Sequence, residues 1–274
     1  MMRTLTNFQQ RFFMSILGIG CLIVILATSH IWPFQFLFLG ALAYVQAKSL
    51  QEYYSLCKVK TFSPQIEVTT LFSIGYIFFH YFSKDIVGPL FTLLALLFLF
   101  SFKTHKQAIS TTATTFFGFC YITLPLSLAI DINFPTYSHT CFWMVYLIVI
   151  TKMTDMTAYF SGKLLGRRLL TPILSPKKTI EGAVGGIIGA SFSSYLFYSF
   201  SESMRSVVSS AFEACLLGAL LGIVAEIGDL AESLLKRDAE VKDSSQLPGF
   251  GGMLDIVDSL LFTTPVLYFW LSPL

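Results

Sequence analysis

Acidic side chains gather near the C-terminal end of a chain that is otherwise strongly apolar. Glu226, Asp229 and Ser233 are spaced three and four residues apart, which places them on one face of a helix. Asp255 and Asp258 share a face at the start of the next apolar stretch. Carboxylates among apolar residues are energetically expensive. They therefore indicate either a functional site or an internal salt-bridge network between two helices.

The chemistry of these groups favours phosphate transfer. Clustered carboxylates without Cys or His favour a hard cation such as Mg²⁺, alone or with a second cation. Lys236, Arg237 and Lys242 follow the acidic helix, which indicates that phosphate groups share the site. A Gly-rich turn at 249–252 then leads into the last apolar stretch. Together these features predict metal-assisted phosphoryl or nucleotidyl transfer.

A second polar segment, Ser-Pro-Lys-Lys-Thr-Ile-Glu-Gly at 175–182, precedes another apolar stretch. Thr179 and Glu181 are typical of a helix start, and the Lys pair at 177–178 lies beside the free N–H groups of that start. Such an arrangement can bind an anion. The alternative is a basic cytoplasmic loop that only holds the membrane topology.

The elements that carry these residues are expected to be membrane helices. Apolar residues make up 54% of the 274 residues and charged residues only 12%, against about 25% in soluble domains. The mean hydropathy is +0.69. This composition excludes a soluble enzyme, a disordered chain and a disulfide-rich secreted module. The apolar stretches are too long for barrel strands, so we predict an all-α, polytopic transmembrane protein.

About nine spans are predicted, and the chain reads as a single membrane-embedded domain, with N-terminal hydrophobic helices at 1–150 and catalytic helices at 151–274. The spans lie at 12–29, 31–47, 68–83, 86–102, 109–130, 139–158, 180–200, 207–230 and 254–273. The first stretch has a signal peptide as its alternative, because Ala27-Thr28-Ser29 loosely resembles a cleavage site.

The basic residues predict the orientation. With the N-terminus in the cytoplasm, sixteen of the 18 Lys and Arg residues fall on inner segments and only Lys84 and Arg205 on outer loops. This split predicts a multi-pass protein with its site on the cytoplasmic side of the membrane. The short chain, in which no soluble extension is seen, favours the bacterial inner (plasma) membrane over an organelle membrane. The net charge of +2 gives no reason to expect a nucleic-acid partner. The five Cys and four His residues are scattered, which argues against a zinc site or a Cys/His nucleophile.

The two polar segments together resemble the phosphatidate cytidylyltransferase (CDP-diacylglycerol synthase) family. Its signature combines Ser-x-apolar-Lys-Arg, Lys-Asp, and a Gly-Gly turn followed by two Asp residues. The matching positions are Ser233, Lys236, Arg237, Lys242, Asp243, Pro248, Gly251, Gly252, Asp255 and Asp258. Residues 175–182 resemble the family's second recognisable stretch, and the resemblance covers roughly residues 150–265. Phe250 and Ile256 depart from the pattern, which commonly has His and Arg at these positions.

The resemblance implies that CTP and phosphatidate react to give CDP-diacylglycerol and pyrophosphate. It implies catalytic roles for Asp229, Asp255, Lys236 and Lys242, and Mg²⁺ ligation by Asp229, Asp255 and Asp258. The residues expected to bind substrate are Ser175, Lys177, Lys178, Thr179, Ser233, Arg237, Asp243, Gly251 and Gly252. The expected partners are CTP, phosphatidate and membrane lipids, with a homodimer left open.

Two other functions compete with this one. A CTP-dependent lipid-alcohol kinase would need a base that activates a hydroxyl group. An ion-coupled transporter would use intramembrane carboxylates as cation sites, but its inverted repeats are not visible in the sequence.

Overall fold

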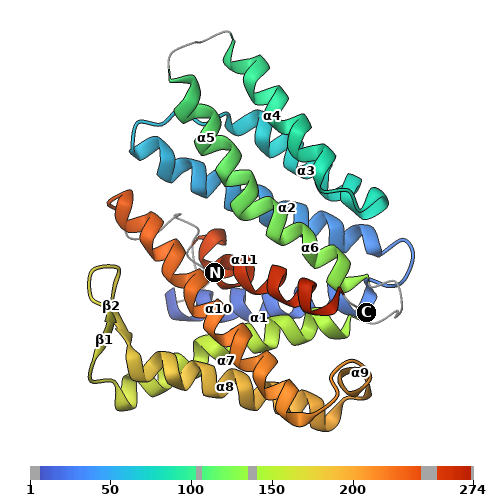
Figure 1. The fold of residues 1–274 in the computed structure, drawn as a ribbon, viewed down its shortest axis with the longest axis vertical. Helices are drawn as coiled ribbons and strands as arrows, with labels where there is room; N and C mark the ends of the chain where they lie inside the picture. The colour runs from blue at the N-terminus through green and yellow to red at the C-terminus, as the bar shows by residue number, and fades with distance from the viewer. Residues whose placement is uncertain (1–6, 103–106, 135–140, 242–251, 273–274) are drawn as a thin grey trace, which may run out of the picture. The chain divides into compact units, whose positions relative to one another are not determined.

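The computed structural model describes residues 7–102, 107–134, 141–241 and 252–272, with side chains from residue 17 onward (Figure 1). The chain forms two compact units. Unit 1 comprises residues 1–130 and 238–256, and unit 2 comprises residues 131–237 and 257–274. Each unit is described by itself.

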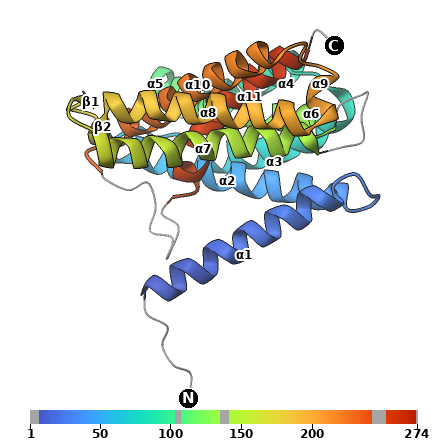
Figure 2. The same ribbon diagram turned by 90° about the horizontal axis from the view of Figure 1, so that it is seen from below.

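Unit 1 is built from the N-terminal helices and the first turn of the last helix. Its elements are α1 (Asn7–Thr28), α2 (Gln35–Val59), α3 (Ile66–Ser83), α4 (Val87–Ser101), α5 (Ala108–Gly118), the π-helical turn η1 (Phe119–Thr123), the first part of α6 (Leu124–Asn133) and the start of α11 (Met253–Leu271). Figure 2 shows α1 diverging from α2. Tyr76, Leu93, Leu97 and Phe119 form a buried apolar cluster between α3, α4 and η1.

Close packing of α5 on α2 depends on Gly118. A Cβ atom at this position would lie 2.7 Å from ring carbons of both Tyr53 and Tyr54. The two tyrosines can therefore reach the α5 backbone, where their hydroxyl groups donate to Thr114 O (3.4 Å) and Thr115 O (2.9 Å). These contacts bind α2 to the helical segment that runs through α5, η1 and α6.

Unit 2 holds most of the predicted site. Its elements are α7 (Phe142–Leu165), β1 (Leu169–Thr171), β2 (Ser175–Thr179), α8 (Ile180–Phe200), α9 (Glu202–Arg205), most of α10 (Ala211–Asp238) and the rest of α11. Helices α7 and α8 lie side by side (Figure 2). A Cβ at Gly185 or Gly189 of α8 would collide with Ser161 or Thr157 of α7. Small residues thus allow the close contact that membrane helices use in place of hydrophobic burial.

The predicted loop before α8 contains a short antiparallel hairpin, in which Leu169 pairs with Thr179 and Thr171 with Ser175. The predicted helix start is confirmed: Thr179 is the N-cap of α8, and its hydroxyl oxygen accepts the N–H of Gly182 at 3.1 Å. Glu181 accepts the N–H groups of Arg167 and Arg168 at 3.0 and 3.2 Å. The start of α8 and the hairpin therefore hold each other in place. Because of this hairpin, the fold is nearly all-α, whereas an all-α fold was predicted.

The chain is a helical membrane protein. Four helical segments of the described chain are long and apolar enough to cross a membrane, at Ala108–Asn133, Ile180–Phe200, Ala211–Asp238 and Met253–Leu271, and two shorter apolar helices lie at Leu17–Thr28 and Val87–Ser101. The count of nine is not confirmed. The predicted spans at 31–47 and 139–158 lie in α2 and α7, which also carry charges such as Glu52, Lys152 and Asp155. These charges lower the hydropathy of both helices.

Candidate active site

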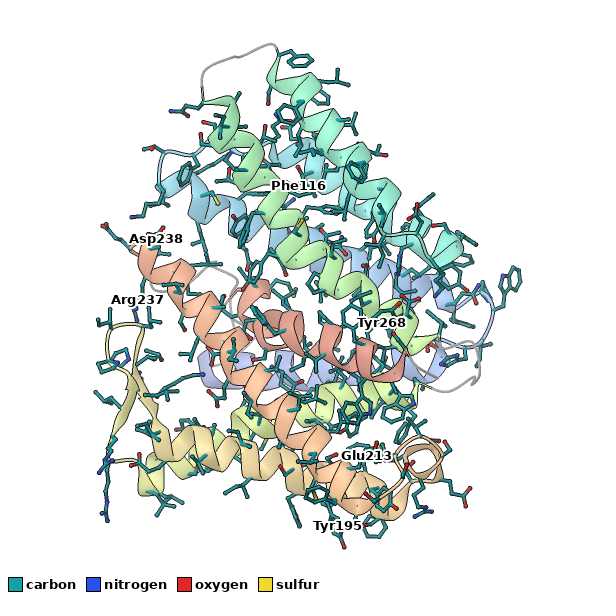
Figure 3. All side chains as sticks on the ribbon, in the orientation of Figure 1. Phe116, Tyr195, Glu213, Arg237, Asp238 and Tyr268 are labelled. Carbon is teal, nitrogen blue, oxygen red and sulfur yellow. The ribbon has the colours of Figure 1, made fainter. Side chains whose placement is uncertain are left out.

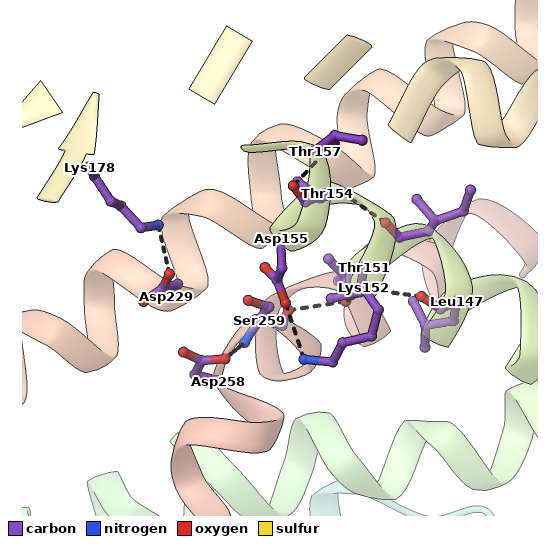
Figure 4. Close-up of polar contacts among 12 residues, drawn as sticks. Leu147, Thr151, Lys152, Thr154, Asp155, Thr157, Lys178, Asp229, Asp258 and Ser259 are labelled. Atoms are coloured by element: carbon purple, nitrogen blue, oxygen red, sulfur yellow. Dashed lines mark hydrogen bonds and ion pairs between the residues drawn. The ribbon is translucent and has the colours of Figure 1, made fainter. Parts of the chain in front are cut away.

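The two polar segments of the sequence meet at Lys178. Its ammonium group, at the end of β2, lies 2.7 Å from Glu226 Oε2 and 2.7 Å from Asp229 Oδ2, both on α10 (Figure 4 shows the contact with Asp229). The side chains of Lys178 and Glu226 are only 21% and 10% exposed, whereas that of Asp229 is 33% exposed. Lys178 therefore binds a carboxylate that is mostly withdrawn from water and one that remains accessible.

Electrostatics stabilise the charged form of Lys178. Burial acts to lower the pKa of the ammonium group, but the carboxylates of Asp229 and Glu226 outweigh it and raise that pKa above its ordinary value of 10.5. The group is accordingly a fixed positive charge at neutral pH.

Two more carboxylates face the same region from other helices. Asp155 of α7 pairs with Lys152 at 3.1 Å, and Asp258 of α11 accepts the N–H of Ser259 (Figure 4). Figure 4 shows the side chains of Asp155, Asp229 and Asp258 in the same region of unit 2. Three helices, α7, α10 and α11, thus each direct one carboxylate toward a common region.

Gly228 permits this arrangement. A Cβ at this position of α10 would lie 2.7 Å from Asp258 O and 3.0 Å from Ser259 Cα, so the backbone of α11 runs directly against the glycine. Any larger residue would push the helices apart next to Asp229. The neighbouring glycine is therefore what brings the carboxylates of α10 and α11 together.

The donor set has the chemistry of a divalent-cation site. Among the described residues, this group contains four carboxyl groups, those of Asp155, Glu226, Asp229 and Asp258, and two ammonium groups, those of Lys152 and Lys178. The carboxyl groups outnumber the ammonium groups, and the ligands are all oxygens, as Mg²⁺ prefers. Within the described residues, no three His, Cys, Asp or Glu side chains stand close enough together to share a metal ion. The residues fit Mg²⁺ by charge and ligand type, while the present side-chain positions do not form a closed site.

Four of the predicted substrate-binding residues lie on the hairpin and on α10, the elements that carry Lys178 and Asp229. Ser175 and Lys177 are on β2, with Lys177 exposed, and Ser233 is half-buried on the face of α10 that carries Asp229. Thr179 serves as the N-cap of α8.

The two basic residues at the end of α10 have protein partners. Lys236 lies 2.7 Å from Glu232 Oε2, on its own helix. Arg237 donates from Nε to Leu174 O at 3.0 Å, in the β1–β2 turn; Figure 3 shows Arg237 beside that turn. Arg237 therefore attaches the hairpin to α10.

Some predicted site residues are not brought to this group by the described structure. Lys242, Asp243 and Gly251 lie outside the described residues. Asp255 and Gly252 belong to unit 1, where Asp255 Oδ2 accepts the N–H of Gly252 at 2.9 Å. Their predicted roles stay predictions.

Asp155 and Glu226 are the site residues that sequence reasoning did not assign. Asp155 interrupts an apolar stretch of α7, and Glu226 lies one turn before Asp229 on the same face of α10. Both could have been found from the sequence, because placing a carboxylate among apolar residues costs free energy and therefore indicates a functional or paired group.

The comparisons with known proteins show the family to which the chain belongs. The sequence model described as the cytidylyltransferase family matches residues 9–274. The chain belongs to this family.

The chain is also similar to individual proteins that are named phosphatidate cytidylyltransferases. A phosphatidate cytidylyltransferase of Synechocystis is 31% identical over 298 aligned residues, covering 95% of both chains. Those of Chlamydia muridarum and Bacillus subtilis are 38% and 37% identical, over 58% and 63% of this chain and 54% and 61% of theirs. The chain thus spans little more than half the length of the Chlamydia relative.

Proposed function

We propose that the protein is a phosphatidate cytidylyltransferase, which converts CTP and phosphatidate to CDP-diacylglycerol and pyrophosphate. The observation that carries the proposal is the contact of Lys178 with Asp229. It joins the two segments that resemble the family, and it places a cation beside a group of carboxylates. The names of the relatives from Synechocystis, Chlamydia and Bacillus support the same reaction.

The reaction needs no protein nucleophile. An oxygen of the phosphatidate phosphate, already ionised at neutral pH, attacks the α-phosphorus of CTP. A new phosphorus–oxygen bond forms, the bond between the α-phosphorus and the bridging oxygen breaks, and its electron pair leaves with pyrophosphate. The protein must therefore orient two anions and stabilise the charge that develops between them.

Lys178 is suited to the second task. Its ammonium group is held between Glu226 and Asp229, so its position is set before substrate arrives. We assign to it a contact with the triphosphate, with the exposed Lys177 beside it on the same strand. Lys236, Arg237 and Lys242 would supply further phosphate contacts.

Mg²⁺ is proposed as the cofactor, held by Asp229 and Asp258 with Asp155 beside them. Asp255, on the first turn of α11, is retained as a further ligand. When bound, the ion would neutralise the α-phosphate and the leaving group. The carboxylates themselves bind and orient, and their excess over the ammonium groups attracts the cation. A second cation is left to experiment.

The cytoplasmic face of the bacterial inner membrane is the proposed location of the site, with the N-terminus on the same side. The Lys and Arg distribution supports this orientation, and the bacterial relatives support the membrane. The acyl chains of phosphatidate would remain among apolar helices while the headgroup reaches Lys178. A homodimer is left to experiment.

The test is a product assay with purified protein in lipid nanodiscs, phosphatidate and Mg²⁺. CTP labelled at the α-phosphate should transfer its label to the lipid fraction, while CTP labelled at the γ-phosphate should give labelled pyrophosphate. A lipid-alcohol kinase would label lipid only from the γ-position, and a transporter would label it from neither. Either of these results would refute the proposal.

A further inference from the structure

Glu52 lies in the N-terminal half of the chain, on α2, and its side chain is bound to the start of α11. The residue is 7% exposed. Glu52 Oε1 accepts the N–H of Met253, and Oε2 accepts the N–H of Leu254, both at 2.8 Å. Glu52 and both partners belong to unit 1. One carboxylate therefore binds two successive N–H groups in the first turn of a helix about 200 residues away in the chain.

These hydrogen bonds satisfy donors that a helix cannot satisfy itself. The first N–H groups of a helix have no acceptor within it, and the helix dipole places a partial positive charge there. A carboxylate is thus the best-matched acceptor, and hydrogen bonds to it are stronger than neutral ones. Gly252, which precedes α11, has no side chain with which to cap it. The acceptor for the N–H groups of Met253 and Leu254 therefore comes from another helix.

A carboxylate that binds two adjacent N–H groups fixes the rotation of the helix as well as its position. Successive residues are about 100° apart around a helix axis, so a shift of one residue would redirect every side chain that follows. Asp255 follows in the first turn of the same helix and belongs to the same unit as Glu52. The direction of the Asp255 carboxylate is therefore linked to Glu52.

We propose that Glu52 is a positioning residue, which fixes the first turn of α11 and thereby the direction of Asp255. The expected effect on catalysis rests on the proposed function. The expected effect on the backbone at the start of α11 can be measured without any enzymatic activity.

Glu52→Gln is the informative substitution, because it keeps the shape of the side chain. The amide keeps one acceptor oxygen and puts an N–H₂ group opposite the second backbone N–H. Hydrogen–deuterium exchange of the backbone amides of Met253 and Leu254, measured by mass spectrometry, should become at least about tenfold faster. The kcat for CDP-diacylglycerol formation should fall at least about tenfold, with KM for CTP changing less than about threefold. Glu52→Asp, which keeps the charge, should recover part of both losses.

Gln46→Leu is the matched control. Gln46 is also buried on α2, and its amide donates to Ser73 O in α3, away from α11. This variant should leave exchange at 253–254 and kcat within about twofold of the unmodified protein. Unchanged exchange at these residues in Glu52→Gln would overturn the inference, as would losses no greater than those of the control. If the unmodified protein makes no product, the proposed function fails, and the exchange measurement alone decides on Glu52. Should Glu52→Gln fail to insert, Glu52→Asp takes the same measurements and the same criteria.

Discussion

Lys178→Met tests the centre of the site, because it removes the ammonium group and keeps most of the side-chain volume. Two carboxylates lose a partner at 2.7 Å. Breaking a fully buried ion pair by removing one partner is destabilising by about 3–5 kcal/mol. Asp229 is a third exposed, so water compensates part of its loss, whereas Glu226 is 10% exposed and is compensated little. We therefore expect the free energy of unfolding to fall by about 2–3 kcal/mol.

The catalytic effect should be separable from the loss of stability. A phosphate contact made by Lys178 in the transition state predicts a fall in kcat of at least about 100-fold, equivalent to about 2.7 kcal/mol. The double variant Lys178→Met with Glu226→Gln removes the uncompensated buried charge as well. It should recover at least half of the lost stability and almost none of the lost activity.

Lys163→Met is the matched control for the loss of a positive charge. Lys163 lies exposed near the end of α7, with its ammonium group 5.9 Å from the centre of the Tyr159 ring. Thermal unfolding in nanodiscs and the labelled-CTP assay measure all the variants. Turnover of Lys178→Met within about threefold of the unmodified protein would refute the role assigned to Lys178. Stability equal to that of Lys163→Met would refute the energetic reasoning.

The stabilisation that Lys178 provides depends on pH in a direction that its raised pKa determines. The pKa of Lys178 is raised in the folded protein, so the stabilisation it provides is fully present below the ordinary lysine pKa of 10.5 and is lost only as the pH rises through the higher folded-state value. The stability difference between the unmodified protein and Lys178→Met should accordingly be constant between about pH 7 and pH 9. A difference that disappears within this interval would contradict the assignment.

Three further predictions address the elements around Lys178. Gly228→Ala should lower kcat in the labelled-CTP assay at least about tenfold, because the new Cβ displaces the α11 backbone beside Asp258. Gly40→Ala is the control and should leave kcat unchanged, because a Cβ at this position meets nothing within 4 Å. Asp155→Asn should raise the Mg²⁺ concentration needed for half-maximal activity at least about fivefold, and an unchanged requirement would remove Asp155 from the site. A single Cys at position 177 on a cysteine-free background should react with a membrane-impermeant maleimide only in inside-out vesicles, and labelling of intact cells would reverse the predicted orientation.

Local patterns in the sequence predicted the parts of the site that depend on local structure. The start of α8 at Ile180 follows from Thr179, whose hydroxyl oxygen accepts the N–H of Gly182 three residues later, and from the acidic Glu181 in the first turn. The shared face of Asp229 and Ser233 follows from helical periodicity, and both lie on α10. These features need no knowledge of distant contacts.

Distant contacts account for what the sequence did not predict. The pairing of Lys178 with Glu226 joins positions 48 residues apart, and Asp155 reaches the other carboxylates only because α7, α10 and α11 converge. The hairpin at 169–179 was expected to be a loop, because two strands of three and five residues leave almost no periodic pattern. The predicted span in α7 is not confirmed, because this helix combines apolar residues with Lys152 and Asp155.

The structure also gives a physical reason for the Gly-Gly-x-x-Asp part of the family signature. Asp255 lies at the third position of α11, and its Oδ2 accepts the N–H of Gly252, as the acidic residue of a capping box does. Asp255 thus uses Oδ2 to bind the backbone N–H group at the start of its own helix. Asp258 follows three residues later and is buried beside Gly228. The two signature carboxylates therefore differ in their roles. Asp255 binds the backbone at the start of α11, and Asp258 contributes charge beside Asp229. For this reason the loss of Asp255 should disturb the fold at 252–254 as well as catalysis, whereas the loss of Asp258 should leave that turn intact.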